Sequence, residues 1–296
     1  MRVGVAGVGR MGAAIAAHLI EVSHDVTVWN RAPEKTKPLA DAGAKVAKTP
    51  AELAAQSDAV ITILTNKEAQ AAVYEQPNGL LASDAKGKLF IEMSTVQPHD
   101  EVALAEKVRA KGGIFVECPV GGTVGPARQG KLLGVAGGTA EDFARAKPLL
   151  AQMCRRVEHV GPVGAGSSMK LALNLPLMIY YQALGESLVL CRHLGLDNKW
   201  LMEFLSDTSG APTVLKTRGA AIASALDGKD IGAANFDVDL IRKDLRTMLA
   251  EAEKRGARLP LVAQALAVYD EAANDGWGKR DGAWLPAYWG STRSGQ

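Results

Sequence analysis

The stretch Gly7-Val8-Gly9-Arg10-Met11-Gly12 follows a short apolar strand, predicted over residues 3–6, and opens a helical run that continues to Ile20. A glycine turn between a first strand and a helix is typical of dinucleotide-binding folds. Gly7 allows the tight turn, Gly9 lets the backbone approach a pyrophosphate, and Gly12 lets the helix pack closely on the strand. The helix N-terminus then offers N–H groups and a positive dipole end to the phosphates. We therefore expect all six residues to contribute to a dinucleotide site, the alternative being a purely structural turn.

Strands and helices alternate through the first half of the chain. Apolar runs predict strands over residues 3–6, 26–29, 60–64, 89–93, 114–117, 132–136 and 156–160. The segments between them predict helices over 33–42, 50–56, 67–74, 98–110 and 141–153. This alternation indicates an α/β fold with a Rossmann-type, doubly wound parallel sheet.

The pattern changes at a glycine-rich hinge, Gly161–Gly166. Beyond it the sequence predicts no strand, but helices over residues 167–194, 198–205, 212–226, 237–255 and 260–274. Pro176 falls inside the first of these, where a missing N–H and a steric clash predict a kink. We expect a dinucleotide-binding Rossmann domain over residues 1–162. An all-α C-terminal domain for substrate binding and oligomerisation would follow over 163–296, joined by the long helix.

Composition excludes several classes of protein. The chain has 296 residues, of which 47% are apolar and 22% charged, as in ordinary globular proteins. A formal charge of +2 is too small for a nucleic-acid surface, and no apolar run is long enough to span a membrane. No secretory leader pattern is present, and the three cysteines, Cys118, Cys154 and Cys191, are widely spaced. We therefore expect a cytoplasmic protein with reduced thiols, no metal site, and no nucleic-acid or membrane partner.

The end of the second strand bears on the choice of cofactor. NAD-binding folds usually place an acid there, which bonds the ribose hydroxyls and repels a 2′-phosphate. Here the residues are Trp29-Asn30-Arg31, with no acid among them. Asn30 can bond a ribose oxygen, and Arg31 can offer a planar set of donors to a phosphate. We expect NADP to be preferred and NAD to be possible; in the alternative, Arg31 is simply solvated and either cofactor binds.

A lysine in an apolar helical stretch marks the candidate catalytic position. Lys170 lies among Met169, Leu171, Ala172 and Leu173, four residues before Asn174. The i, i+4 spacing puts Lys170 and Asn174 on one face of the helix. In the structural alternative, the aliphatic stem of Lys170 is buried and its ammonium group reaches water.

Five motifs together resemble the β-hydroxyacid dehydrogenase family, which includes 3-hydroxyisobutyrate dehydrogenase and the tartronate semialdehyde, succinic semialdehyde and glyoxylate reductases. The resemblance covers essentially the whole chain. The motifs are Gly7–Gly12, Ser94-Thr95-Val96-Gln97-Pro98, Pro119-Val120-Gly121-Gly122, Gly164-Ala165-Gly166 with Lys170 and Asn174, and Lys243-Asp244-Leu245.

The resemblance implies an NAD(P)-dependent oxidoreductase that interconverts a small β-hydroxy acid and its semialdehyde. Lys170 would be the acid/base and Asn174 would orient the substrate. The substrate, a small carboxylate or semialdehyde, would be held by the loop at Gly121 and Gly122. Ser94 and Thr123 are also expected to bind the substrate. The cofactor site is expected to include Leu64, Thr65, Thr95 and Lys243. A homodimer or homotetramer is expected.

The chain departs from the family pattern in the carboxylate loop, so the substrate is not defined. The family usually has Pro-Val-Ser-Gly-Gly, whereas this chain has Gly121 in place of the serine and a hydroxyl two residues later at Thr123. Pro126 also occupies a position where glycine is common. Two alternatives are an NADPH-dependent imine reductase and a catalytically inactive dinucleotide-binding interaction module. Lys170 argues against both, because imine reductases generally carry another residue there and an inactive relative would be expected to lose it.

Overall fold

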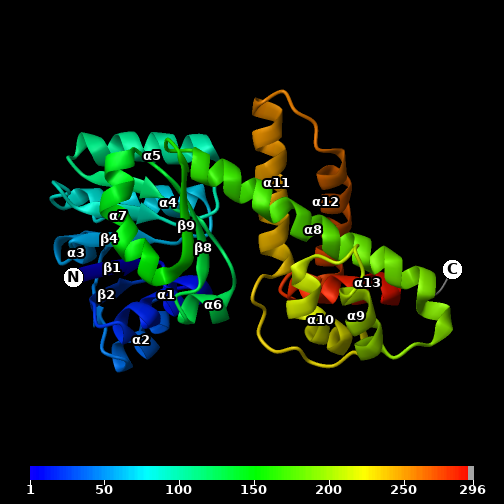
Figure 1. Ribbon diagram of the computed structural model, residues 1–296. Helices are drawn as coiled ribbons and strands as arrows, with labels where there is room; N and C mark the ends of the chain where they lie inside the picture. The colour runs from blue at the N-terminus through cyan, green and yellow to red at the C-terminus, as the bar shows by residue number, and fades with distance from the viewer. Residues whose placement is uncertain (293–296) are drawn as a thin grey trace. The chain divides into compact units, whose positions relative to one another are not determined.

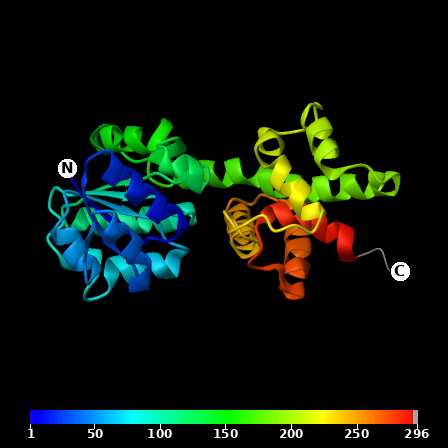
Figure 2. The same cartoon turned by 90° about the horizontal axis from the view of Figure 1, so that it is seen from below.

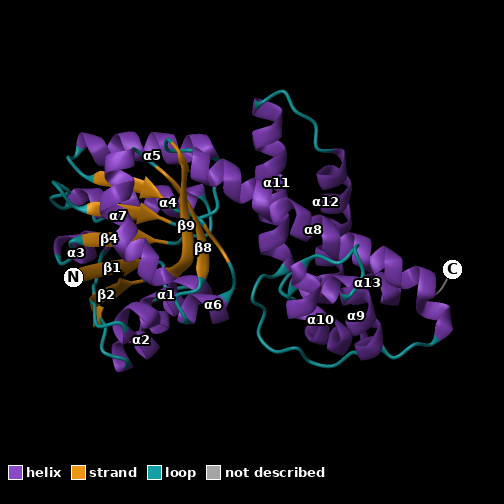
Figure 3. Ribbon diagram, viewed as in Figure 1, coloured by secondary structure: helices purple, strands orange, loops and turns teal. Residues whose placement is uncertain are grey.

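The structure, a computed structural model, describes residues 1–292. The chain divides into two compact units, Met1–Ala172 and Leu173–Gln296. The first unit contains every named strand, whereas the described part of the second is built from helices (Figure 3). The division lies inside the long helix α8 (Ala165–Cys191), while the domain boundary expected after residue 162 falls just before that helix begins.

The first unit is built on one nine-stranded sheet (Figure 1). Six strands follow the order β3-β2-β1-β4-β5-β6 and are parallel, which is the strand order of a Rossmann fold. Beyond them β8 is antiparallel to β6, and it pairs with β7 and β9. The strands are β1 (Arg2–Ala6), β2 (Asp25–Trp29), β3 (Lys45–Val46), β4 (Ala59–Thr62), β5 (Leu89–Glu92), β6 (Ile114–Glu117), β7 (Val120–Gly121), β8 (Leu132–Gly137) and β9 (Cys154–Gly161). The predicted α/β class is confirmed.

Helices cover both faces of this sheet (Figure 2). They are α1 (Arg10–Glu21), α2 (Lys37–Asp41), α3 (Pro50–Ala55), α4 (Lys67–Glu75), α5 (Pro98–Ala110), α6 (Val124–Arg128) and α7 (Ala140–Met153), with short 3-10 turns η1 (Pro33–Thr36) and η2 (Leu80–Ala82). Successive strand residues point to opposite faces. Ile91 therefore joins the core beneath α1 and α7, while Phe90 joins the core beneath α3, α4 and α5. Because β1 to β6 are parallel, their carboxyl ends all lie at the same edge of the sheet.

Local differences from the predicted elements have simple causes. The helix expected over 33–42 is divided into η1 and α2, each with a proline in its first turn. The strand expected over 60–64 ends at Thr62. The short elements β3, β7, α6 and α13 (Leu285–Thr292) were not predicted, because two to eight residues carry too little periodicity to be recognised.

The second unit contains most of α8 and packs further helices around it. These are α9 (Asn198–Ser206), α10 (Thr213–Leu226), α11 (Val238–Lys254), α12 (Pro260–Ala272) and α13, with short turns η3 (Arg192–Leu194), η4 (Ala273–Trp277) and η5 (Gly282–Trp284). Helix α8 runs as one element through Pro176. Within residues 1–292, no helix combines the length and the apolar character that a membrane crossing requires.

Candidate active site

The glycine turn between β1 and α1 shows which glycines the fold itself requires. Gly7 has φ +96°, and a Cβ there would lie 2.5 Å from the Ile63 carbonyl oxygen. A Cβ on Gly12 would overlap the Gly7 carbonyl oxygen and lie 2.8 Å from Ile63 Cγ2. Gly9 differs, because its φ of −68° is ordinary and a Cβ there would meet nothing within 4 Å. The fold does not need a glycine at position 9, so the open space above it fits a ligand that approaches the backbone.

The rest of the turn presents backbone to that space. Val8 is buried in the core, and Met11 packs partly against it. Gly9 caps α1 without a side chain. The first N–H groups of a helix lack partners within the helix, and they lie at the positive end of its dipole. A pyrophosphate can bind here without displacing any capping side chain, so these residues fit a dinucleotide.

The end of β2 lies beside this turn, because the Gly7 N–H donates to the Trp29 carbonyl oxygen at 2.9 Å. Asn30 is half-buried and donates through Nδ2 to the Ala32 carbonyl oxygen at 3.0 Å, which holds the following loop. Arg31 is exposed. The one acid of β2, Asp25, lies at the opposite end of the strand in an ion pair with Lys45. The residues at the end of β2, Trp29, Asn30 and Arg31, therefore include no acid that would repel a 2′-phosphate.

Two predicted residues from neighbouring loops are brought together at the carboxyl ends of β4 and β5. The Leu64 N–H donates to Ser94 Oγ at 2.8 Å. Ser94, which is 2% exposed, donates in turn through Oγ to Glu92 Oε1 at 2.5 Å. Thr95 is half-buried and Thr65 is exposed. The Ser94 hydroxyl thus ties the two loops together, and its role toward a substrate stays a prediction.

Beneath these loops lies a buried carboxyl cluster that the sequence reasoning missed. Gln70 Nε2 donates to Glu92 at 2.6 Å and to Glu101 at 2.9 Å. Burial raises the pKa of Glu92, and burial followed by the Glu92 charge raises the pKa of Glu101 well above its usual value. The signal in the sequence was an acid at the end of a buried strand. The cluster holds Ser94 through the hydrogen bond to Glu92. Burial and the neighbouring Glu92 charge both favour the protonated form of Glu101.

The glycine loop after β6 needs a glycine at one of its two central positions only. Gly121 pairs with Leu133 of β8, and a Cβ there would make only an ordinary 3.7 Å contact. Gly122 is exposed with φ +127°, a conformation that favours glycine. Thr123 is exposed and precedes α6 without forming a side-chain cap. Position 121 could therefore hold the family's serine, so its absence is a chemical difference and not a requirement of packing.

Lys170 lies in the second turn of α8 and is 7% exposed. Most of the side chain is therefore buried, as both interpretations of this lysine expect. One turn further on, Asn174 donates through Nδ2 to Asp244 Oδ2 at 3.1 Å. Asp244 is 2% exposed, and its Oδ1 lies 2.6 Å from Lys243 Nζ. Asp244, the middle residue of the Lys243-Asp244-Leu245 motif, thus joins two predicted site residues, Asn174 and Lys243.

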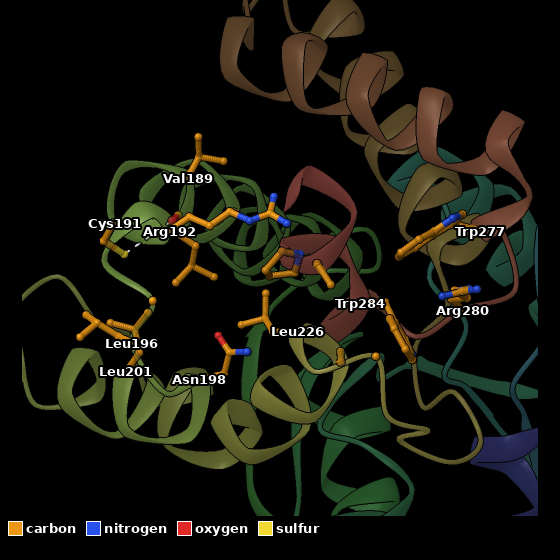
Figure 4. A pocket seen from close by; sticks show the side chains of 17 residues that line it. Val189, Cys191, Arg192, Leu196, Asn198, Leu201, Leu226, Trp277, Arg280 and Trp284 are labelled. Atoms are coloured by element: carbon orange, nitrogen blue, oxygen red, sulfur yellow. Dashed lines mark hydrogen bonds between the residues drawn. The ribbon is translucent and has the colours of Figure 1, made fainter. Parts of the chain in front are cut away.

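A separate cavity of about 620 Å³ lies in the second unit (Figure 4). Leu188, Leu201 and Trp284 are among its lining residues, and none of the predicted site residues is. Because no predicted site residue lines this cavity, we do not assign the active site to it. Within residues 1–292, no group of three or more His, Cys, Asp or Glu residues is placed to hold a metal ion.

Comparison with known proteins shows which family the chain belongs to. Residues 2–161 match the family model described as the NAD binding domain of 6-phosphogluconate dehydrogenase. Residues 164–287 match the model described as NAD-binding of NADP-dependent 3-hydroxyisobutyrate dehydrogenase. The mitochondrial 3-hydroxyisobutyrate dehydrogenase of Bos taurus is 34% identical over 284 residues, which covers 94% of this chain and 84% of that one.

The chain belongs to the β-hydroxyacid dehydrogenase family. Glyoxylate/succinic semialdehyde reductase 1 of Arabidopsis thaliana is 31% identical, covering 95% of this chain and 96% of that one. The solved 3-hydroxyisobutyrate dehydrogenase of Mycobacterium tuberculosis superposes with a TM-score of 0.84 at 27% identity, covering 97% and 98% of the two chains. Like other β-hydroxyacid dehydrogenases, the chain is an NAD(P)-dependent oxidoreductase that acts on a CH–OH group.

Proposed function

We propose that this enzyme uses NADPH in preference to NADH to interconvert a small β-hydroxy acid and its semialdehyde, with Lys170 as the acid/base. The observation that carries the proposal is a buried lysine on α8, 7% exposed, in a chain with an open dinucleotide turn. Bound NADPH would supply the hydride for reduction. Asn30 and Arg31 support the preference for NADPH, because neither opposes a 2′-phosphate.

Lys170 supplies the proton in the direction of reduction. Hydride addition to an aldehyde carbon leaves negative charge on the carbonyl oxygen, and the Lys170 ammonium group donates a proton to that oxygen. In the direction of oxidation, the neutral amine takes the hydroxyl proton as the hydride leaves. Burial keeps water away from the ammonium group, which strengthens its interaction with the developing charge.

The remaining residues bind and orient the substrate. The loop at Gly121 and Gly122 binds the substrate carboxylate, with the backbone N–H of Gly122 and the Thr123 hydroxyl as donors. Asn174 orients the reacting group, and Asp244 holds the Asn174 amide in place through the 3.1 Å hydrogen bond. Lys243, Thr95, Thr65 and Leu64 are assigned to the cofactor, and Ser94 to the substrate.

The test of this proposal is Lys170→Ala, with Lys199→Ala as the matched control because Lys199 is 77% exposed. Removing a positioned acid/base should lower kcat by about 10²- to 10⁴-fold, or roughly 3–5 kcal/mol of barrier. Lys170→Arg should also be slow, because guanidinium stays protonated and differs in shape. Fluorescence titration should show unchanged NADPH affinity. Near-normal kcat in Lys170→Ala would overturn the assignment.

A spectrophotometric screen of NADPH oxidation identifies the substrate and tests the alternatives. Its panel is glyoxylate, succinic semialdehyde, tartronate semialdehyde, a sulfonated aldehyde and a cyclic imine. Turnover of an aldehyde acid supports the proposal. Turnover of the imine alone would favour an imine reductase, and NADPH binding without any turnover would favour an inactive interaction module.

We also propose that the enzyme is a cytoplasmic homodimer or homotetramer. Apolar side chains gather on the surface at the end of α8 and on α9, where Leu190 is 80% exposed and Phe204 is 57% exposed. A patch of this kind favours self-association. Sedimentation analysis measures the assembly, and a monomer would contradict it. The three unpaired cysteines support a reducing compartment, which localisation of a tagged chain would test.

A further inference from the structure

Glu117 joins the end of β6 to the start of α8. The residue is 0% exposed, and its carboxylate accepts hydrogen bonds from the segment that opens the helix. The N–H groups of Gly164 and Gly166 donate to Oε1, the latter at 2.9 Å. The N–H and Oγ of Ser167 donate to Oε2 at 3.1 and 2.5 Å. One buried side chain therefore satisfies three backbone donors and one hydroxyl at the helix N-terminus.

Two glycines, Gly137 and Gly166, leave the space that the Glu117 carboxylate occupies. A Cβ on Gly137 would overlap Glu117 Oε1. A Cβ on Gly166 would lie 2.6 Å from the Val135 carbonyl oxygen and 3.2 Å from the Glu117 carboxyl carbon. Gly164 has φ +97°, so the chain turns sharply into α8 at that point. The helix start is thus held between β8 and the Glu117 side chain at a defined position.

Two opposing effects act on the Glu117 carboxyl group. Burial raises its pKa, while the four hydrogen bonds from Gly164, Gly166 and Ser167 and the positive end of the α8 dipole favour the carboxylate. Lys170 lies three residues after Ser167 on the same rigid helix. A shift of the first turn therefore moves the lysine with it, because both lie within the first two turns of one continuous, hydrogen-bonded helix.

We propose that Glu117 is a positioning residue that fixes the start of α8 and thereby the place of the Lys170 ammonium group. The inference rests on the role of Lys170 proposed above. It predicts that loss of the Glu117 contacts lowers the rate of the chemical step and leaves the glycine turn, and hence NADPH binding, intact. A displacement of about 1 Å at a reacting group can cost about 100-fold in rate.

The experiment compares Glu117→Gln with Thr139→Ala. The glutamine keeps the size of the side chain but places an NH₂ group opposite the N–H of Ser167, so that donors face each other. Thr139 caps α7 by accepting from the Asp142 N–H at 3.0 Å, so its alanine variant also loses a helix cap in the same unit, but not on α8. Thermal unfolding, kcat, KM and NADPH affinity are measured for both.

We expect Glu117→Gln to lose about 10- to 100-fold in kcat with NADPH affinity unchanged. Thr139→Ala should unfold at a lower temperature and keep its kcat. Glu117→Asp should recover part of the lost rate, because its carboxylate can still reach some of the donors. Amide hydrogen exchange should be faster in Glu117→Gln at Gly166 and Ser167, and unchanged at the start of α7.

Wild-type kcat in a folded Glu117→Gln, or wild-type exchange at Gly166 and Ser167, would overturn the inference. If this variant does not fold, Ser167→Ala replaces it, because it removes one of the four bonds; wild-type kcat and exchange there would again count against the inference. The exchange measurement does not depend on catalysis. It therefore judges the anchoring role of Glu117 separately from the proposed role of Lys170, which fails on its own if Lys170→Ala stays active.

Discussion

Replacing Gly9 by alanine should separate cofactor binding from folding. The new methyl group would meet no protein atom within 4 Å, and the φ of −68° is one that alanine adopts. Gly9→Ala should therefore fold normally. The same methyl group would occupy the space through which a pyrophosphate must approach the first N–H groups of α1. The expected loss is in NADPH affinity alone.

Two small effects on the folding free energy oppose each other in this variant. Alanine reduces the entropy of the unfolded chain, which stabilises the protein by about 0.4–1 kcal/mol. Alanine is also a poorer N-cap than glycine, which costs on the order of 0.5–1 kcal/mol. The net change should be within about 0.5 kcal/mol of zero. Binding changes more, because one lost hydrogen bond to a charged phosphate costs about 1.5–3 kcal/mol, equivalent to roughly 10- to 150-fold in Kd.

The assay is NADPH titration by fluorescence beside thermal unfolding without cofactor. Gly210→Ala is the control, since its Cβ would also meet almost nothing, with the closest atom at 4.0 Å, and it lies far along the chain from the turn. Gly12→Ala provides the contrast, because its Cβ would overlap the Gly7 carbonyl oxygen and destabilise the fold by about 1–3 kcal/mol or more. An unchanged NADPH Kd in Gly9→Ala would refute the assignment of the turn.

Three further variants test the cofactor preference, the substrate loop and the buried acids. Asn30→Asp should weaken the binding of NADPH about tenfold more than that of NADH, because a carboxylate would face the 2′-phosphate. Steady-state kinetics with both cofactors measure this, and a wild-type enzyme that prefers NADH would contradict the proposed preference. Gly121→Ser fits without steric overlap and should change KM for aldehyde acids by about fivefold through one hydrogen bond, with the NADPH KM as the control. Glu101 has a raised pKa when folded, so the stability that its proton contributes is present at low pH and lost as pH rises through the folded pKa. Glu101→Gln cannot lose that proton, so its melting temperature should fall less than that of the wild type as the pH rises above the ordinary glutamate pKa of about 4.3; parallel curves would contradict the argument.

The fold could be predicted because its signals are local. The glycine turn, the apolar strands and the helical segments each show their period within about ten residues, and the α/β class follows from their alternation. Helix α5 and strand β6 have the predicted bounds, Pro98–Ala110 and Ile114–Glu117. Short elements such as β3 were missed, because two residues become a strand only through pairing with β2.

Some site residues also carry a local signal in the sequence, whereas others are recognised only by their contacts in the folded chain. Lys170 stood out in the sequence because a charge is unusual in an apolar helix, and Gly9 because of its motif. Glu117, Glu101 and Asp244 did not, since an acid at the end of a strand or within a helix does not show which distant donors it will meet. Glu117 meets its partners about 50 residues further along the chain, and Asp244 meets Asn174 across 70 residues.

The sequence alone determined the order of the longer strands and helices and the dinucleotide turn, because each depends on residues that are neighbours in the chain; Lys170 became the candidate acid/base through the family resemblance. Only the tertiary structure decided that Gly9 is free of packing constraints, that Lys170 is buried and that Glu117 caps α8. These properties depend on which distant atoms surround a residue. Burial and hydrogen bonding arise when segments far apart in sequence pack together, and no local pattern encodes that contact.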